Sequence, residues 1–171
     1  MKFLIPLLML FTFSVFAEEL YEGDIFADEA YNMQKKGEAV IIDVRTSVEY
    51  IYVGHGEGFI NIPLFDWTYE PKDLETRVQS ASYEVEKKTI KDHAATQKLY
   101  NAKERENKNF VSDVMKVMKL KNVDKVILVC RSGPRSKVAA NMLAKAGISA
   151  YNLEDGFIFG WQADKMPWGG Q

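Results

Sequence analysis

The chain has 171 residues, of which 47% are hydrophobic and 27% charged, a balance that excludes disorder throughout and indicates one ordinary globular domain. Its formal net charge of −2 at pH 7 gives no overall basic excess, so the composition does not indicate a nucleic-acid-binding protein. An anionic ligand would therefore have to be bound by a local cluster of positive charge.

Residues 1–17 have the pattern of a secretory signal peptide. Lys2 precedes the apolar stretch FLIPLLMLFTFSVFA, which ends at the small residue Ala17 and is followed by the acidic Glu18. An uncleaved membrane anchor is the alternative, but the apolar stretch contains Pro6 and is shorter than the roughly 20 residues that a spanning helix needs. We therefore predict cleavage after Ala17 and an exported protein, with the periplasm as its compartment.

A helix and a buried strand are the next predicted elements. The segment 25–36 is predicted to be helical, with Asp24 as its N-cap and Gly37 just beyond its last turn. Residues 39–44, AVIIDV, form a short apolar run rich in β-branched residues, as in strands that are buried on both faces.

A short helix is predicted over 47–52. Thr46 and Glu49 form a T-x-x-E capping box at its start, and Gly54 ends it. After the segment GHGEGFINIPL (54–64) the alternation of strand and helix signals is interrupted until residue 125.

The regular pattern returns near the carboxyl end of the chain. KVILV (125–129) is predicted to be a strand, and 135–146 a helix that ends before Gly147. SAYNL (149–153) is a further predicted strand. The alternation predicts an α/β fold with a central, mostly parallel sheet flanked by helices, formed by one domain over 18–171.

The single cysteine, Cys130, directly follows the strand 125–129. Ligands of parallel α/β sheets bind beyond the carboxyl ends of the strands, and the loop CRSGPR lies there, at the positive end of the following helix. Arg131 and Arg135 add two positive charges, so the setting favours a reactive thiolate and an anion site. The alternative is that Cys130 is a small buried hydrophobic residue without chemistry of its own.

The length of this loop separates two kinds of chemistry. Cysteine-dependent phosphatases need a C-x5-R loop, in which the arginine clamps two phosphate oxygens. Here Ser136 occupies the position of that arginine, and Arg135 comes one residue early. The tighter loop suits a smaller group, such as one extra sulfur atom on the cysteine, and disfavours a phosphatase or an arsenate reductase.

Three motifs resemble those of single-domain rhodaneses, the thiosulfate sulfurtransferase-like family: IIDVRTSVEYIYVGHGEGFINIP, VILVCRSGPRS and NLEDGFIFGW. The resemblance covers about 24–64 and 123–165, and it implies an α/β fold and sulfur transfer through a cysteine persulfide. By the family pattern Cys130 is the sulfur carrier. The loop residues expected to bind the sulfur substrate are Arg131, Ser132, Gly133, Arg135 and Ser136.

Other motif residues are expected to be structural. Asp43, Arg45 and Glu49 match the family's DVR…E segment, where capping and ion pairing are the simplest roles. His55 matches a glycine-flanked turn and is interpreted as a hydrogen-bonded structural residue rather than a ligand or base.

Three further residues complete this interpretation. Phe157 and Trp161 match the family's closing segment and are expected in the core. His93 lies in a polar segment, and no cluster of ligands with metal-site spacing accompanies it in the sequence, so no metal site is expected.

The segment 65–108 is an insertion relative to the family pattern. It is heavily charged but nearly neutral, and apolar residues recur in it at helical spacing: Leu74, Val78, Ala81 and Val85. We expect a helical segment that packs on the domain. A lid or a docking surface for a partner protein is the functional alternative, because the aromatic residues of FDWTYE begin the segment.

The sequence therefore predicts an exported sulfurtransferase. The Cys130 thiolate would take a sulfane sulfur from thiosulfate, a polysulfide or a persulfide and pass it to a thiol or cyanide, in a ping-pong cycle without metal or organic cofactor. The expected partners are small sulfur-containing anions and thiols, with no nucleic acid and no stable membrane insertion after signal cleavage. The alternative is a non-catalytic module that binds an anion or a partner protein, whose function a Cys130→Ser change would preserve.

Overall fold

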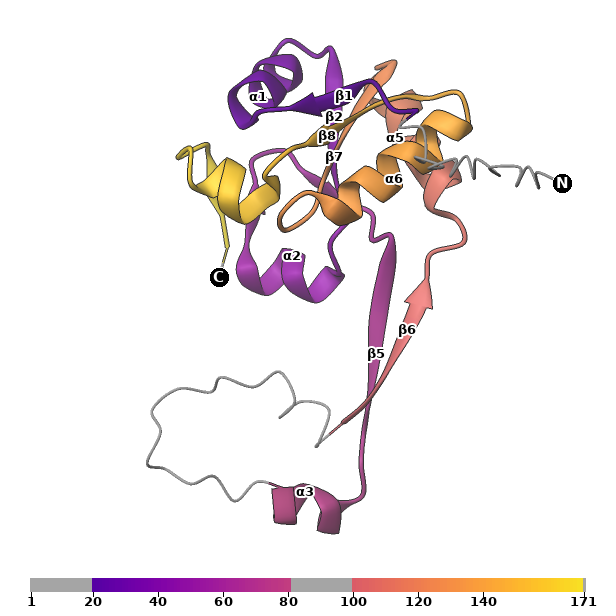
Figure 1. The fold of residues 1–171 in the computed structure, drawn as a ribbon, viewed down its shortest axis with the longest axis vertical. Coiled ribbons are helices and arrows are strands. Elements are labelled where there is room, and N and C mark those ends of the chain that lie inside the picture. Colours follow the sequence, from indigo (N-terminus) through magenta and orange to yellow (C-terminus); the bar gives the residue numbers. More distant parts are fainter. Residues whose placement is uncertain (1–19, 81–99, 171) are drawn as a thin grey trace, which may run out of the picture.

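A computed structural model describes residues 20–80 and 100–170, and its centre is a five-stranded sheet in the order β1-β8-β7-β2-β4 (Figure 1). All four pairings in this sheet are parallel. The elements in chain order are β1 (Gly23–Ile25), α1 (Ala27–Lys35), β2 (Ala39–Asp43), α2 (Ser47–Val53), β3 (His55–Gly56), β4 (Ile60–Asn61), β5 (Phe65–Pro71), α3 (Leu74–Ser80), β6 (Tyr100–Glu106), α5 (Phe110–Lys121), β7 (Lys125–Val129), α6 (Pro134–Lys145), β8 (Ser149–Leu153), the π-helix η1 (Gly156–Gln162) and β9 (Trp168–Gly169). The predicted α/β class is confirmed.

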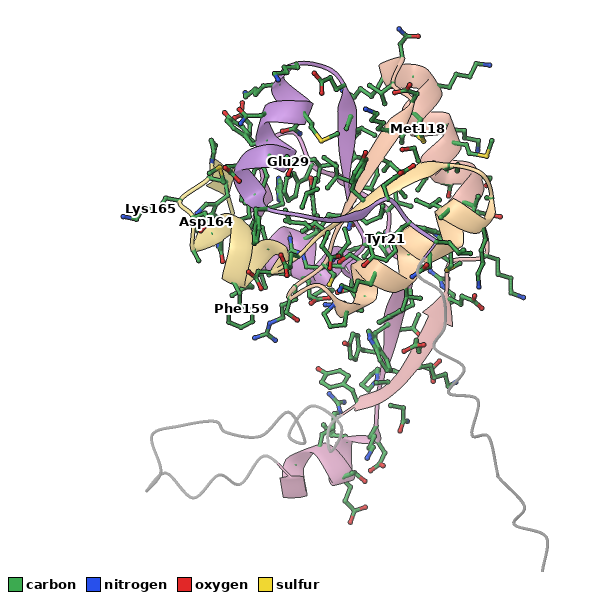
Figure 2. All side chains as sticks on the ribbon, turned by 45° about the horizontal axis from the view of Figure 1, so that its top comes forward. Tyr21, Glu29, Met118, Phe159, Asp164 and Lys165 are labelled. Atoms are coloured by element: carbon green, nitrogen blue, oxygen red, sulfur yellow. The ribbon has the colours of Figure 1, made fainter. Side chains whose placement is uncertain are left out.

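The two central strands, β2 and β7, carry the core on both of their faces. Alternate side chains point to opposite faces of a strand, so Val126 and Leu128 of β7 pack on one side and Ile127 on the other. Helices α5 and α6 cover the first side, and α1 and η1 cover the second (Figures 1 and 2). Phe157 and Trp161 of η1 are fully buried in the second cluster, which confirms their predicted place in the core.

The ends of the predicted helices agree with the structure, except for the start of the first predicted helix. Helix α2 begins with the predicted capping box, and Gly54 ends it. Helix α6 ends one residue before Ala146, and Gly147 follows with the positive φ of 78° that a helix terminator adopts. Gly37, with a φ of 71°, likewise follows the end of α1.

The prediction that Asp24 is the N-cap of the first helix is wrong, because Asp24 lies in strand β1 and Phe26 is the residue that precedes α1. The Asp24 carboxylate accepts hydrogen bonds from Tyr21 and Asn152 and forms an ion pair with Lys137 at 2.7 Å. Since β1 pairs with β8 at the edge of the sheet, Asp24 ties this edge to α6 instead of capping a helix.

The insertion also differs from the prediction. Its first and last described parts are not helical but form the antiparallel pair β5–β6, in register from Phe65 opposite Glu106 to Pro71 opposite Tyr100. This two-stranded ribbon projects from the domain, with α3 beyond its far end (Figure 1). Leu74 and Val78 of α3 are 67% and 64% exposed, so this helix does not pack on the core.

The remaining predictions for this region and for the N-terminus fall partly outside the described residues. The expected signal peptide over 1–17, the helical positions Ala81 and Val85, and His93 all lie there. In the two described stretches, none of the helices combines the length and apolar character needed to cross a bilayer.

Candidate active site

Cys130 lies at the carboxyl end of β7, where the chain turns into α6, and only 1% of its surface is exposed. Its Sγ atom accepts a hydrogen bond from the Gly133 N–H at 3.2 Å and lies 3.3 Å from the Ser136 hydroxyl oxygen. Both donors come from the start of α6, whose dipole also favours negative charge. The sulfur therefore lies in surroundings that stabilise an anion.

The Ser136 hydroxyl has two acceptors within reach. Its oxygen lies 2.7 Å from the carbonyl oxygen of Gly133 as well as 3.3 Å from Cys130 Sγ. A hydroxyl carries one proton, so it can donate fully to only one of them at a time. Because Ser136 is completely buried, this choice of acceptor is made inside the protein and not in water.

The loop is fastened to the segment that follows β8. The N–H of Phe157 donates to the Cys130 carbonyl at 2.8 Å, and the N–H of Ile158 donates to that of Arg131 at 3.1 Å. Gly133 has a φ of 103°, and a Cβ atom there would collide with the carbonyl oxygen of Glu154. The loop thus requires glycine at this position for both its backbone conformation and its close packing.

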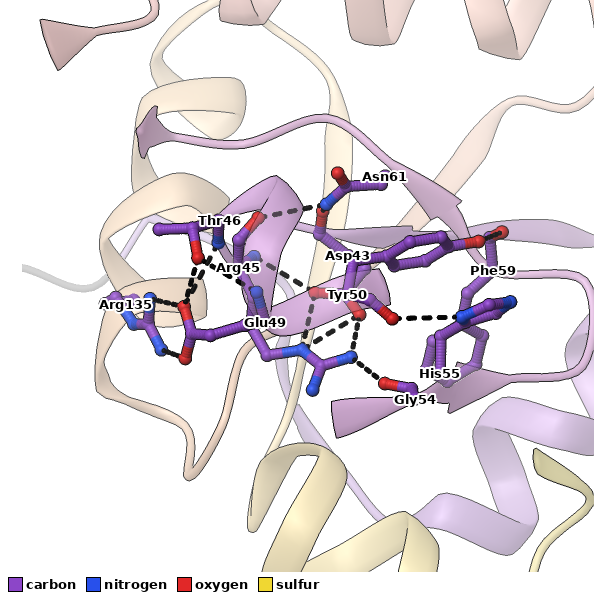
Figure 3. A network of polar contacts seen from close by, with 10 residues as sticks. All are labelled: Asp43, Arg45, Thr46, Glu49, Tyr50, Gly54, His55, Phe59, Asn61 and Arg135. Atoms are coloured by element: carbon purple, nitrogen blue, oxygen red, sulfur yellow. Dashed lines mark hydrogen bonds and ion pairs between the residues drawn. The ribbon is translucent and has the colours of Figure 1, made fainter. Parts of the chain in front are cut away.

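Arg135 forms a two-pronged ion pair with Glu49 of α2, at 2.8 Å and 2.7 Å (Figure 3). Partial burial alone would raise the pKa of the Glu49 carboxyl, but the Arg135 guanidinium and the N–H and hydroxyl of Thr46 outweigh burial and lower this pKa to about 2. The hydrogen bonds to Glu49 raise the pKa of Arg135. The positive charge expected at position 135 is therefore opposed by a carboxylate beside the same loop.

Arg131 and Ser132 occupy a different position in the loop. Both side chains are exposed, whereas Gly133 and Ser136 are buried and Arg135 is intermediate. Arg131 is thus the loop cation that faces solvent. The five predicted site residues other than Cys130 therefore differ in position: Gly133 and Ser136 are buried beside the sulfur, Arg131 and Ser132 lie at the loop surface, and Arg135 is half-buried in its ion pair with Glu49.

A second polar network holds the segment that leads into α2 (Figure 3). Arg45 forms an ion pair with Asp43 at 2.6 Å and donates to the Gly54 carbonyl at 2.7 Å, and its guanidinium lies 4.2 Å from the centre of the Phe157 ring. Asn61 adds hydrogen bonds from its side-chain amide to two carbonyls of the same segment. This network confirms the ion-pairing role expected for Asp43 and Arg45 and fixes α2, which carries Glu49.

His55 has a structural environment. Its ring stacks on Tyr50 with centroids 3.9 Å apart, and its Nδ1 lies 3.2 Å from the Tyr50 carbonyl. This arrangement agrees with the interpretation of His55 as a hydrogen-bonded structural residue. Over residues 20–80 and 100–170, no three side chains of the His, Cys, Asp and Glu types gather as they would around a metal ion.

Sequence reasoning missed two neighbours of the loop. Glu49 was expected to cap α2 but not to bind Arg135, from which it is separated by 86 residues. The Phe65 ring at the start of β5 lies 5.8 Å from the Arg135 guanidinium. The FDWTYE stretch offered the only signal for this second contact, through its aromatic residues.

Comparisons with known proteins agree with this architecture. The M. tuberculosis protein Rv0390 has a similar structure, with a TM-score of 0.57 and 24% identity over 87% of this chain and 98% of that one. A thiosulfate sulfurtransferase from Pseudomonas aeruginosa gives a TM-score of 0.51 with 19% identity, over 86% of this chain and 20% of that one. At these identities, the likeness concerns the fold.

Sequence relatives and a family model extend the comparison. An uncharacterized protein of Rickettsia prowazekii is 37% identical over 68 residues, which are 36% of this chain and 55% of that protein. The chain thus spans about half the length of the curated relatives it matches. The model of the rhodanese-like domain matches residues 26–164, from the start of α1 to just beyond η1. Since this match covers most of the chain, the protein belongs to the rhodanese-like domain family.

Proposed function

We propose that the protein is a sulfurtransferase that carries a sulfane sulfur as a persulfide on Cys130. The observation that supports this best is the setting of Cys130 Sγ, which lies at the end of a buried strand within 3.3 Å of a backbone N–H and a hydroxyl. Neither donor is a base that would take a proton from the sulfur, and both stabilise negative charge on it. A carrier of an anionic persulfide needs these properties.

In the first half-reaction the Cys130 thiolate attacks the outer sulfur of thiosulfate. A new S–S bond forms on Cys130, the S–S bond of thiosulfate breaks, and its electron pair leaves with sulfite. The charge is conserved, because a thiolate and a dianion become a persulfide anion and a dianion. A polysulfide or a low-molecular-weight persulfide reacts in the same way, with a shorter chain or a thiolate as the leaving group.

In the second half-reaction an acceptor attacks the outer sulfur of the persulfide. With a thiolate acceptor the products are an acceptor persulfide and the Cys130 thiolate, and with cyanide they are thiocyanate and the same thiolate. No electrons enter or leave the pair of half-reactions as a whole. The cycle is therefore of the ping-pong type, and this chain's residues supply the nucleophile and the stabilising donors.

The two arginines have different roles in this proposal. Arg131 is exposed and attracts anionic donors to the loop, and Arg135 neutralises Glu49, which would otherwise repel them. The nearly neutral Arg135–Glu49 pair leaves Arg131 as the charge that steers the donor.

Intact mass spectrometry tests the proposal directly. Incubation with thiosulfate should add the mass of one sulfur atom to the protein, and a thiol or cyanide should remove it. Cys130→Ser should abolish the adduct and the turnover, because no other cysteine is present. Hydrolysis of an aryl phosphate should be negligible. An unchanged mass of the folded protein after thiosulfate, polysulfide and glutathione persulfide would refute the proposal.

A non-catalytic binding module is the second candidate, and it is favoured by the nearly complete burial of Cys130. In that case the loop recognises an anion or a partner protein without chemistry at the sulfur. This alternative would be established if the Cys130→Ser variant still bound the anion or the partner protein and the wild-type protein formed no sulfur adduct.

A further inference from the structure

The β5–β6 ribbon has two unlike faces. Side chains two residues apart in a strand share a face, and residues directly opposite each other in the register lie on the same side. In the register, Phe65 lies opposite Glu106 and Trp67 opposite Glu104. Tyr69 lies opposite Ala102, and Tyr100 of β6 lies opposite Pro71 on the same side. We call this side the aromatic face and define it by Phe65, Trp67, Tyr69, Tyr100, Glu104 and Glu106.

The opposite side of the ribbon is polar, and it carries both signs of charge in equal number, with Asp66 and Glu70 on β5 and Lys103 and Arg105 on β6. Asp66 accepts a hydrogen bond from the Ser47 hydroxyl at 2.9 Å, and Lys103 forms an ion pair with Glu70 at 3.5 Å. On the aromatic face, by contrast, neither Glu104 nor Glu106 takes part in an ion pair with any residue that the structure describes. The aromatic face therefore combines apolar surface with uncompensated negative charge.

The aromatic face begins beside the active-site loop. Phe65, its first residue, lies 5.8 Å from the guanidinium of Arg135, and the N–H of Asn107 bonds the Leu64 carbonyl at the ribbon's base. From there the seven residues of β5 extend outward by roughly 20 Å at about 3.3 Å per residue. Figure 2 shows the ribbon leaving the same end of the domain at which Phe159 of η1 points outward, 61% exposed.

Packing within the ribbon accounts for only some of its aromatic side chains. Phe65 and Trp67 contact each other edge to face, with ring centroids 6.3 Å apart. Tyr69 and Tyr100, however, remain 47% and 36% exposed among the residues that the structure describes. Aromatic side chains are enriched in the parts of protein interfaces that contribute most to binding. An exposed aromatic surface of this kind indicates an interaction site.

We propose that the aromatic face docks a basic partner protein whose cysteine exchanges sulfur with Cys130. Glu104 and Glu106 select positive charge, and the aromatic rings select apolar side chains. The surface is open and extended, whereas sites for small molecules are concave. Because Cys130 is 1% exposed, the partner's sulfur must be carried on a narrow segment that reaches into the loop while the rest of the partner contacts the ribbon.

This inference rests on the proposed persulfide on Cys130. The partner's thiolate attacks the outer sulfur, the S–S bond to Cys130 breaks, and Cys130 leaves as the thiolate. The reverse transfer, from a partner persulfide to Cys130, uses the same bonds, so neither direction needs an oxidant or a reductant.

A binding experiment tests docking without any chemistry. The probes are two labelled peptides of about twelve residues with a central serine, one rich in lysine and leucine and one rich in glutamate and leucine, measured by fluorescence anisotropy on Cys130→Ser protein. The basic peptide should bind at least about 10-fold more tightly, and Trp67→Ala with Tyr69→Ala should weaken it by about 10-fold. Thr68→Ala with Lys103→Ala, on the polar side, is the matched control and should leave binding unchanged.

A charge reversal makes this result independent of folding defects. Glu104→Lys with Glu106→Lys should exchange the preference, so that the acidic peptide binds more tightly than the basic one. Equal binding of the two peptides to the wild-type protein would overturn the proposal. A dimer in sedimentation experiments that Trp67→Ala with Tyr69→Ala dissociates would also overturn it, since a second copy would then be the occupant.

A transfer experiment tests the link to Cys130. The basic peptide with a central cysteine and glutathione are compared as acceptors from the persulfide protein. Trp67→Ala with Tyr69→Ala should lower kcat/KM for the peptide about 10-fold and leave the glutathione rate unchanged. Equal losses for both acceptors would show a structural effect and overturn docking. Peptide binding without any persulfide on Cys130 would refute the proposed sulfur transfer, including this exchange, while leaving a binding surface.

Discussion

At Cys130, the stabilisation of negative charge comes from hydrogen-bond donors rather than from a nearby unpaired cation. The Gly133 N–H donates to the sulfur, and the Ser136 hydroxyl can turn from the Gly133 carbonyl to the sulfur when the sulfur becomes more negative. Such a rotation needs no movement of the backbone. The loop can therefore stabilise a thiolate at Cys130 without a change in its backbone conformation.

The Arg135–Glu49 pair leads to a prediction about charge at the loop. Arg135→Ala should lower kcat/KM for thiosulfate by roughly 10- to 1,000-fold, or about 1.4–4 kcal/mol, because it leaves the Glu49 carboxylate unpaired beside an anionic substrate. The double change Arg135→Ala with Glu49→Gln removes that carboxylate charge and should recover at least about 5-fold of the loss. Steady-state kinetics of both variants measure this coupling. A double variant no more active than the single one would contradict the neutralising role.

The same pair predicts how stability depends on pH. The pKa of Glu49 falls from 4.5 to about 2 on folding, so as the pH decreases the unfolded state takes up a proton first. The pair's contribution is therefore present above pH 4.5 and is lost between about 4.5 and 2. Glu49→Gln should be less stable than the wild type by roughly 1–2 kcal/mol at pH 6, because solvent screens this partly exposed pair, and by progressively less below pH 4.5. Urea unfolding of both proteins at several pH values measures the difference, and a difference independent of pH would be inconsistent with this origin.

At the scale of the elements, burial decides how well the sequence predicts the structure. Strands β2 and β7 are buried on both faces, so their continuous apolar runs are visible in the sequence, and both strands were predicted. Helix α5 was missed although Phe110 and Val114 bury one side of it. Its other side is exposed and basic, and it follows directly on the charged insertion, so no clear boundary marks its start.

The ribbon was not predicted, because charged residues hide the alternation of apolar and polar residues that marks a strand. In β5 apolar and polar residues alternate from Phe65 to Glu70, a period of two that is typical of a strand. Strand β6 contains mostly charged residues and is exposed along its whole length, so it lacks such a pattern. The partner strand lies about 35 residues away, as in the contact between Thr68 and Lys103, and only the fold brings the two together.

The position of the ribbon predicts that the domain folds without it. Phe65 and Glu106 are directly opposite each other at its base, so replacing residues 66–105 by Asn-Gly joins them through a tight hairpin turn. The shortened protein loses the Ser47–Asp66 hydrogen bond, and its free energy of unfolding should decrease by only about 1 kcal/mol. Urea unfolding measures this change. Loss of cooperative unfolding would show that the ribbon is part of the core structure.

At the scale of the whole molecule, the sequence predicted the location of the site better than its contacts. The strand-to-helix loop, Cys130 and the fold class follow from local patterns and the resemblance to rhodaneses. The partner of Arg135 does not follow from local patterns, because Glu49 comes from the other half of the chain. The parallel pairing of β2 and β7 brings α2 and α6, the helices that follow these strands, to the same edge of the sheet. Contacts of this kind depend on the three-dimensional arrangement of strands and have no local signature.

The predicted export of the protein gives the burial of Cys130 a further consequence. Exported compartments are oxidising, and a lone exposed thiol there would form disulfides with other proteins. Cys130 is 1% exposed, so only a small molecule or a narrow segment can reach it. The protein should therefore remain free of disulfide-linked dimers in non-reducing electrophoresis of an extracytoplasmic fraction, whereas urea-unfolded protein under the same oxidising conditions should form them.

The same fraction tests the N-terminal prediction. Because a small residue is needed before the cleavage site, the mature protein should begin at Glu18, and Ala17→Leu should slow the processing and leave a larger form. Mass spectrometry of the intact protein distinguishes the two forms. A full-length chain recovered only from the cytosol would contradict export. It would also place Cys130 in a reducing compartment, where its burial would control access in sulfur transfer and would not be needed as protection from oxidation.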